Sequence, residues 1–177
     1  MKARLLIAAA LIALAAGCTP RSACTIQGVI EDPDNRDGEW IFLVPAGPHQ
    51  DADVDSAIVK GGRFTFTPDS VMVASIRLTM KRRLGLQELL VVTEPGTVKA
   101  VISADSHCSG TPQNDSIQVW KDLTMQLNSL RSSVAPQHLK DSVYTQYKER
   151  TWAIAHGLGD DSVLGKFLLG YYPDKRQ

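Results

Sequence analysis

The sequence has no excess of charge of either sign, few cysteines and no long apolar segment. Its 177 residues carry 19 basic and 19 acidic side chains, which argues against nucleic acid as the main partner, because phosphates require a basic surface. The three cysteines form no C-x-x-C pair and share no zinc-binding spacing with the histidines. No apolar run reaches the roughly 20 residues that span a bilayer. We therefore expect one globular domain with no metal and no cofactor.

The first 17 residues have the features of a secretory signal peptide. Lys2 and Arg4 precede an uncharged run over residues 5–16, and small residues lead up to Cys18. A basic start, a short apolar run and small residues before a cleavage point are typical of such signals. The segment Leu14-Ala15-Ala16-Gly17-Cys18 resembles the lipobox of bacterial lipoproteins. That resemblance implies that a diacylglyceryl group joins the sulfur of Cys18; ordinary secretion with cleavage nearby is the alternative.

Lipidation at Cys18 would make the protein a membrane-anchored lipoprotein. Residues 18–23 would then form a short lipidated tether, and the rest of the chain a domain held at the membrane surface. Several acyl chains anchor stably, because each buried methylene contributes about 0.8 kcal/mol. We expect a protein of the periplasm or cell envelope, anchored to the outer or the inner membrane.

Two further cysteines, Cys24 and Cys108, lie 84 residues apart in the sequence. The envelope is normally oxidising, so a disulfide between them is one expectation, and it would close a long loop. Cys24 begins the first predicted strand and Cys108 ends the strand-rich region, so the two could lie side by side. Two unpaired thiols are the other expectation. A catalytic dithiol is disfavoured, since thioredoxin-type chemistry uses cysteines close in sequence.

Residues 24–110 read as a β-rich region of about seven to eight strands. Short β-prone runs alternate with turn residues, which is typical of an antiparallel β-sandwich or meander. The runs cover residues 25–30, 40–44, 55–59, 63–67, 71–80, 89–93 and 97–103. Gly61-Gly62 stands between two alternating segments, and this pattern predicts a β-hairpin.

Residues 111–177 read as a helical extension packed on the same domain. Thr111-Pro112 has the pattern of a helix start, and Ile117, Trp120 and Leu127 recur at helical spacing up to about residue 134. A second helix is predicted over residues 139–156 and a short third one after Ser162. Two to three helices after the strands give an α+β fold. The three tryptophans lie in periodic segments and are expected to pack in the core.

Several segments together resemble a domain of unknown function, number 4369. The segment that runs from Val54 through Gly61-Gly62 to Phe66 resembles the family's signature. Glu94-Pro95-Gly96, the run from Ser109 to Asp115, and Gly165-Lys166-Phe167 also fit. The resemblance covers residues 24–172 and implies a β-rich domain with following helices, usually in envelope lipoproteins. In relatives the domain often precedes a thioredoxin-like, peroxiredoxin-related domain. This chain contains no Trp-Cys-x-x-Cys segment, so we expect it to lack the redox chemistry of those relatives.

The remaining candidate chemistry is sparse. Lys81, Arg82 and Arg83 form a cationic run at a predicted turn, where they could meet an anionic surface or be a solvated hairpin tip. No G-x-S-x-G segment marks a hydrolase nucleophile. We expect no catalytic residues.

Three functions are compatible with these patterns. The first is a non-catalytic, lipid-anchored envelope protein that acts as a binding or scaffold module for another envelope protein or a ligand. The second is an accessory subunit of a separate thioredoxin-like thiol–disulfide oxidoreductase. The third is a hydrolase-like enzyme with an unrecognised site, which requires a cleft with convergent titratable groups.

Overall fold

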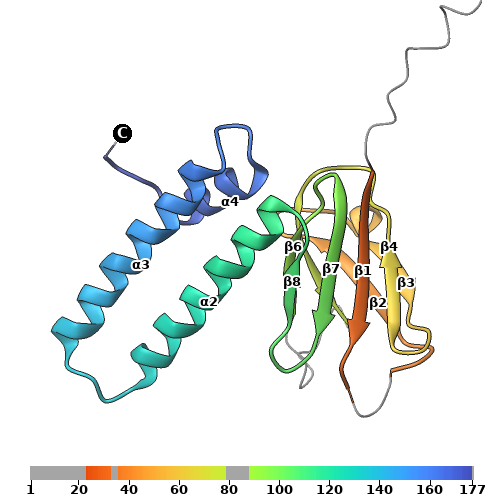
Figure 1. Ribbon diagram of the computed structural model, residues 1–177, viewed down its shortest axis with the longest axis horizontal. Coiled ribbons are helices and arrows are strands. Elements are labelled where there is room, and N and C mark those ends of the chain that lie inside the picture. Colours follow the sequence, from red (N-terminus) through yellow and green to blue (C-terminus); the bar gives the residue numbers. More distant parts are fainter. Residues whose placement is uncertain (1–22, 33–35, 79–87, 177) are drawn as a thin grey trace, which may run out of the picture.

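The computed structural model describes residues 23–32, 36–78 and 88–176, and within them it has eight strands and three α-helices. The strands are β1 (Cys24–Ile30), β2 (Trp40–Pro45), β3 (Asp55–Ile58), β4 (Arg63–Phe66), β5 (Val73–Arg77), β6 (Leu89–Val92), β7 (Gly96–Ile102) and β8 (His107–Ser109). A short 3-10 turn, η1 (Asp51–Asp53), precedes β3. The helices α2 (Pro112–Ser132), α3 (Gln137–Gly157) and α4 (Val163–Tyr171) follow the strands (Figure 1). The α+β prediction is confirmed.

The strands form two four-stranded sheets that share one hydrophobic core. Sheet A has the order β4-β1-β7-β8, and sheet B has the order β3-β2-β5-β6. Buried and less buried residues alternate along β1, β4 and β7, as expected for strands with one face in the core. The largest side chains of this core include Ile26, Ile41, Phe66 and Ile76. The arrangement is a sandwich and not a meander.

One strand pair departs from the expected antiparallel pattern. β1 pairs with β7 in parallel, with Cys24 opposite Gly96 and Ile30 opposite Ile102. All other pairs of the named strands are antiparallel. Parallel neighbours need a long connection, and here the chain between β1 and β7 forms all four strands of sheet B and also β4 of sheet A. No local sequence pattern indicates such a pairing.

The turn of the predicted Gly-Gly hairpin forms, but the prediction that the two flanking strands pair with each other is wrong. Gly61 and Gly62 have φ angles of 58° and 67°, and Lys60 and Arg63 exchange two backbone hydrogen bonds around them, so the tight turn forms. The flanking strands then separate, because β3 pairs with β2 in sheet B whereas β4 pairs with β1 in sheet A. The turn therefore carries the chain from one sheet to the other. Val59, which is fully buried, stands at this crossing.

The helices leave the sandwich as an antiparallel hairpin and return to it. In Figure 1, α2 runs away from β8, α3 lies alongside it in the opposite direction, and α4 returns toward the sheets. α2 packs on β6 and β8, and α4 packs on β5. For α2 and α3, the ends of the helices lie within two residues of those that the sequence predicts. None of these described helices is both long and apolar enough to cross a bilayer.

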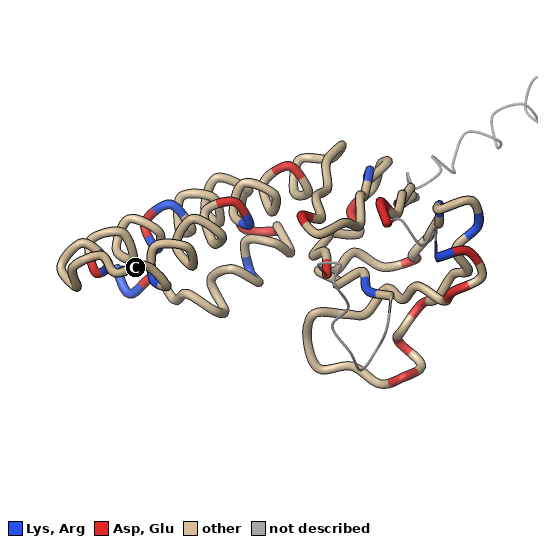
Figure 2. Tube along the Cα trace, turned by 90° about the horizontal axis from the view of Figure 1, so that it is seen from below, with Lys and Arg blue, Asp and Glu red and all other residues tan. Residues whose placement is uncertain are grey.

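Charges of both signs are distributed over the whole molecule. Figure 2 shows Lys and Arg interspersed with Asp and Glu on the sandwich and on the helices. This distribution agrees with the balanced composition of the sequence.

Candidate ligand-binding cleft

A buried asparagine joins helix α2 to the edge of sheet B. The Asn114 Oδ1 accepts the Val92 N–H at 2.9 Å, and the Asn114 Nδ2 donates to the Val92 carbonyl at 2.7 Å and to Thr111 Oγ1 at 2.8 Å. The side chain thus takes the place of a neighbouring strand. Asn114 is completely buried, so these bonds are shielded from water.

Gln113 and Glu94 join the same helix start to helix α4. The Glu94 carboxylate accepts the Gln113 backbone N–H at 2.6 Å and its side-chain amide at 3.1 Å. The Gln113 Oε1 in turn accepts the Ser162 hydroxyl at 2.9 Å and the Leu164 N–H at 3.0 Å. A carboxylate at a helix N-terminus is also favoured by the helix dipole. Segments that carry the family resemblance, Glu94-Pro95-Gly96 and the run up to Asp115, therefore fix how the helices attach.

This attachment leaves a cleft of about 740 Å³ between the helices and β5–β6 of sheet B. That volume lies within the range of small-molecule sites, about 300–1,000 Å³. Its apolar lining includes Leu90, Ile117, Trp120, Met125 and Phe167. Its polar lining includes Ser75, Arg77, Glu88, Gln118, Lys121 and Thr124. An apolar cleft with a few polar groups is the usual form of a ligand site.

Two of the residues that line the cleft each carry a side-chain nitrogen that has no hydrogen-bond partner in the described structure. These are Arg77 Nε and Trp120 Nε1, and both are buried from solvent. The nearest charged contact is that of Arg77 Nη2 with Glu88 Oε2 at 3.8 Å, which is longer than a hydrogen bond. Glu88 Oε2 also accepts the Ser75 hydroxyl at 3.4 Å. An unsatisfied buried donor costs about 1–3 kcal/mol, so such groups require an explanation.

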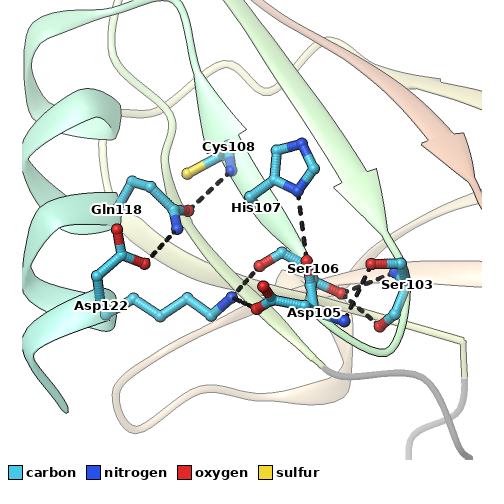
Figure 3. A network of polar contacts seen from close by, with 8 residues as sticks. Ser103, Asp105, Ser106, His107, Cys108, Gln118 and Asp122 are labelled. Carbon is cyan, nitrogen blue, oxygen red and sulfur yellow. Dashed lines mark hydrogen bonds and ion pairs between the residues drawn. The ribbon is translucent and has the colours of Figure 1, made fainter. Parts of the chain in front are cut away.

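The end of the cleft near β8 has a satisfied polar network (Figure 3). The Lys121 ammonium pairs with Asp105 at 2.8 Å and also contacts the Ser106 carbonyl. The ion pair with Lys121 holds the pKa of Asp105 below its usual range. Gln118 accepts the Cys108 N–H at 3.1 Å and donates to Asp122 at 2.9 Å. Lys121 is thus already held by protein groups.

Aromatic side chains of α4 and of Tyr172, the residue after it, line another part of the cleft. The rings of Phe167 and Tyr171 have centroids 4.9 Å apart, and Tyr172 packs edge-on against Tyr147 of α3 at 5.4 Å. Burial, together with a hydrogen bond to Tyr147, raises the pKa of Tyr172. Phe167, Tyr171 and Tyr172 all line the cleft. These neutral rings suit an apolar or aromatic group of a ligand.

The cysteines Cys24 and Cys108 are unpaired and buried. The two residues lie on opposite sides of β7, with Cys24 opposite Gly96 and Cys108 opposite Ala100. Two interstrand spacings alone separate them by roughly 10 Å, beyond the ~7 Å between Cα atoms that a disulfide tolerates. The expectation that they lie side by side is therefore wrong in this fold, and the alternative of two unpaired thiols holds. Burial raises the pKa of both thiols, that of Cys108 to about 12.

Other predicted site residues lie outside the described residues. These are the lipidation residue Cys18 and the cationic run of Lys81, Arg82 and Arg83. Among the residues that are described, no three His, Cys, Asp or Glu side chains converge as a metal site needs. No histidine is among the residues that line the cleft, so Ser75 and Glu88 do not form a Ser–His–acid triad there.

The comparisons with known proteins identify a family but no function. The model of the family described as "Domain of unknown function (DUF4369)" matches residues 24–117, which is more than half of the chain. The chain belongs to this family. The match covers both sheets and the first turns of α2, so Gly165-Lys166-Phe167 lies beyond it. The search of the curated proteins found no match, and the search of the solved structures found none either.

Sequence reasoning did not find the cleft. Arg77 lay inside a predicted strand, and Trp120 was expected to pack in the core like the other tryptophans. Trp120 does pack against the core, but it also lines the cleft. Trp40 is 52% exposed, so the core prediction is wrong for that residue. The one signal in the sequence that could have indicated Arg77 is that it is the only charged residue of the predicted run 71–80.

Proposed function

We propose that this protein is a non-catalytic, lipid-anchored binding protein of the cell envelope whose ligand occupies the cleft between sheet B and the helices. The observation that carries the proposal is the cleft itself, with its apolar walls and two unpartnered donors. The segment before Cys18 supports the lipid anchor, which would attach at the end of the chain that leads into β1.

The ligand site can be tested by blocking the mouth of the cleft. Ala104 is an exposed residue that lines the cleft, so Ala104→Trp adds bulk there without disturbing the core. Ala153→Trp is a matched control, because Ala153 is exposed on α3 and does not line the cleft. We would purify the acylated protein and both variants from native membranes and identify bound small molecules and proteins by mass spectrometry.

We expect a specific molecule with the wild-type protein and Ala153→Trp that is absent or strongly reduced with Ala104→Trp. Equal recovery with all three proteins would show that the cleft is not the binding site. In the same preparation, Cys18→Ser is expected to move the protein from the membrane to the soluble fraction. Retention of that variant in the membrane would contradict the lipid anchor.

The second candidate, an accessory subunit of a separate thioredoxin-like oxidoreductase, is supported by membership of the family. Buried thiols with raised pKa values are poor nucleophiles, so such a role would use a docking surface and not thiol exchange. Crosslinking in native membranes, with thiols blocked at lysis, tests it. Specific recovery of a thioredoxin-like protein is the expected result, and recovery of only unrelated envelope proteins would contradict it.

A further inference from the structure

We propose, on the basis of the binding function above, that the cleft selects a small carboxylic acid with an apolar or aromatic body. Its carboxylate would accept hydrogen bonds from Arg77 and Trp120, and its apolar body would lie against the aromatic side chains. The argument rests on the chemistry of the two unpartnered donors and on the groups around them.

The two unpartnered atoms are both donors, so the missing group is an acceptor. Arg77 Nε and Trp120 Nε1 can each donate one N–H and can accept none. A neutral ligand that offers only donors, or only apolar surface, would leave both atoms unsatisfied. A ligand that satisfies these donors must therefore present oxygen atoms or similar acceptors.

The charges that line the cleft favour an anion over a neutral acceptor. Among the described residues that line the cleft, Arg77 and Lys121 are cationic and Glu88 is anionic. Lys121 is already paired with Asp105. Among the described residues, the charged contact of the Arg77 guanidinium is the 3.8 Å one with Glu88, whose side chain is 38% exposed. Arg77 is therefore the cation that an incoming anion meets.

The shape of the donors favours a carboxylate among anions. A guanidinium binds the two oxygens of a planar carboxylate through parallel hydrogen bonds, and these charge-assisted bonds are the strongest in proteins. The apolar walls argue against a highly charged phosphate, whose burial would require more cations. Because neither donor atom touches solvent in this structure, both Arg77 and Trp120 have to shift as the acid enters. The Arg77 side chain is 24% exposed, and its Nε has no hydrogen-bond partner among the described residues.

Nuclear magnetic resonance of the three indole N–H groups provides the test. The Trp152 indole donates to the Tyr172 carbonyl at 2.8 Å, Trp40 is largely exposed, and the Trp120 indole is the one that is buried without a partner. In the ¹⁵N-labelled full-length acylated protein, held in detergent micelles, Trp120→Phe assigns the resonance. The probes are 3-phenylpropanoate and the uncharged 3-phenylpropan-1-ol.

We expect 3-phenylpropanoate to shift the Trp120 N–H resonance in a saturable way, while the resonances of Trp40 and Trp152 stay unchanged. The alcohol is expected to bind much more weakly. Equal binding of acid and alcohol at Trp120 would overturn the acid inference and leave the binding function standing. No shift of Trp120 with 3-phenylpropanoate would also overturn the inference, and the copurification experiment would then decide the binding function separately.

Two variants that should change the affinity for 3-phenylpropanoate in opposite directions complete the test in the same micelles. Arg77→Gln should weaken 3-phenylpropanoate binding by roughly tenfold or more, because it removes a charged hydrogen-bond donor. Glu88→Gln should strengthen binding, because it removes the competing carboxylate 3.8 Å from Arg77. If neither variant changes the affinity, Arg77 does not hold the acid and the assignment is wrong.

Discussion

The attachment of helix α2 to sheet B predicts a large loss of stability when Asn114 is changed to alanine. The substitution removes the bonds to the N–H and the carbonyl of Val92 and the bond to Thr111. Each buried backbone group left without a partner costs about 1–3 kcal/mol, so the free energy of unfolding should fall by roughly 2–6 kcal/mol. That is a large part of the ~5–15 kcal/mol that stabilises a typical domain.

Urea unfolding followed by far-ultraviolet circular dichroism measures this loss. Asn128→Ala is the matched control, because Asn128 lies on the same helix with an exposed side chain. Its effect should stay within about 0.5 kcal/mol. Equal effects of the two alanine variants would refute the reasoning, since they would show that the Val92 groups lose nothing when Asn114 is removed.

The variant Asn114→Asp keeps the oxygen acceptor of the side chain and removes its amide donor. The carboxylate can still accept the Val92 N–H, but it cannot donate to the Val92 carbonyl and instead faces it with a negative charge. Protonation restores the donor, and burial favours the protonated form, so the pKa of this group should be raised in the folded state. Relative to the wild type, the variant should therefore regain stability as the pH falls. A constant difference between the two proteins from pH 7 to pH 4.5 would contradict this account.

Three further predictions concern the sandwich, the thiols and the C-terminal segment. A Cβ at Gly28 would overlap the ring of a buried phenylalanine, so Gly28→Ala should lower the free energy of unfolding by about 1–3 kcal/mol. Gly47→Ala is the matched control: no atom lies within 4 Å of a Cβ at Gly47, so this variant should keep the free energy of unfolding unchanged. Equal urea midpoints of the two alanine variants would contradict this prediction. The Cys108 thiol, with its pKa of about 12, should react with iodoacetamide only after unfolding, and labelling of the native protein at pH 8 would show that it is accessible. Hydrogen bonds from Arg176 hold the pKa of Asp174 below its unfolded value, so its ionisation stabilises the fold above about pH 4. That contribution is lost as the pH falls through the folded pKa, so the difference in unfolding midpoint between the wild type and Asp174→Asn should narrow from pH 6 to pH 2.5.

Residues within the family match have structural roles, and so does Gly165, which lies beyond the match. Glu94 and Gln113 link β6, α2 and α4, and Gly165 lies where α4 approaches α3 so closely that a Cβ would be 2.8 Å from the Ala155 carbonyl oxygen. None of these residues needs a ligand to explain its place. Of the described residues that line the cleft, half lie within the matched residues 24–117, Arg77 and Glu88 among them, and the other half lie beyond the match.

Local patterns in the sequence predicted the elements but not all of their partners. The strands, the three helices and the turn at Gly61-Gly62 follow from alternation, helical spacing and the freedom of glycine at positive φ. The hairpin prediction failed because the turn sets the direction of only the adjacent residues, whereas burial of Val59 between the sheets sends the strands apart. The disulfide expectation failed because β7 inserts between the strands that carry the cysteines.

The sequence by itself determined the class of the fold and the order of its elements, because these depend on the period and composition of contiguous residues; the membrane anchor stays a prediction. Only the tertiary structure decided the parallel pairing of β1 with β7 and the separation of the two thiols. It also formed the cleft, in which Arg77 of β5 lies beside Glu88 and shares the lining with Trp120 of α2. Those features join residues far apart in the chain. They depend on which surfaces pack together, and that choice is made by the burial of the whole core and not by any one segment.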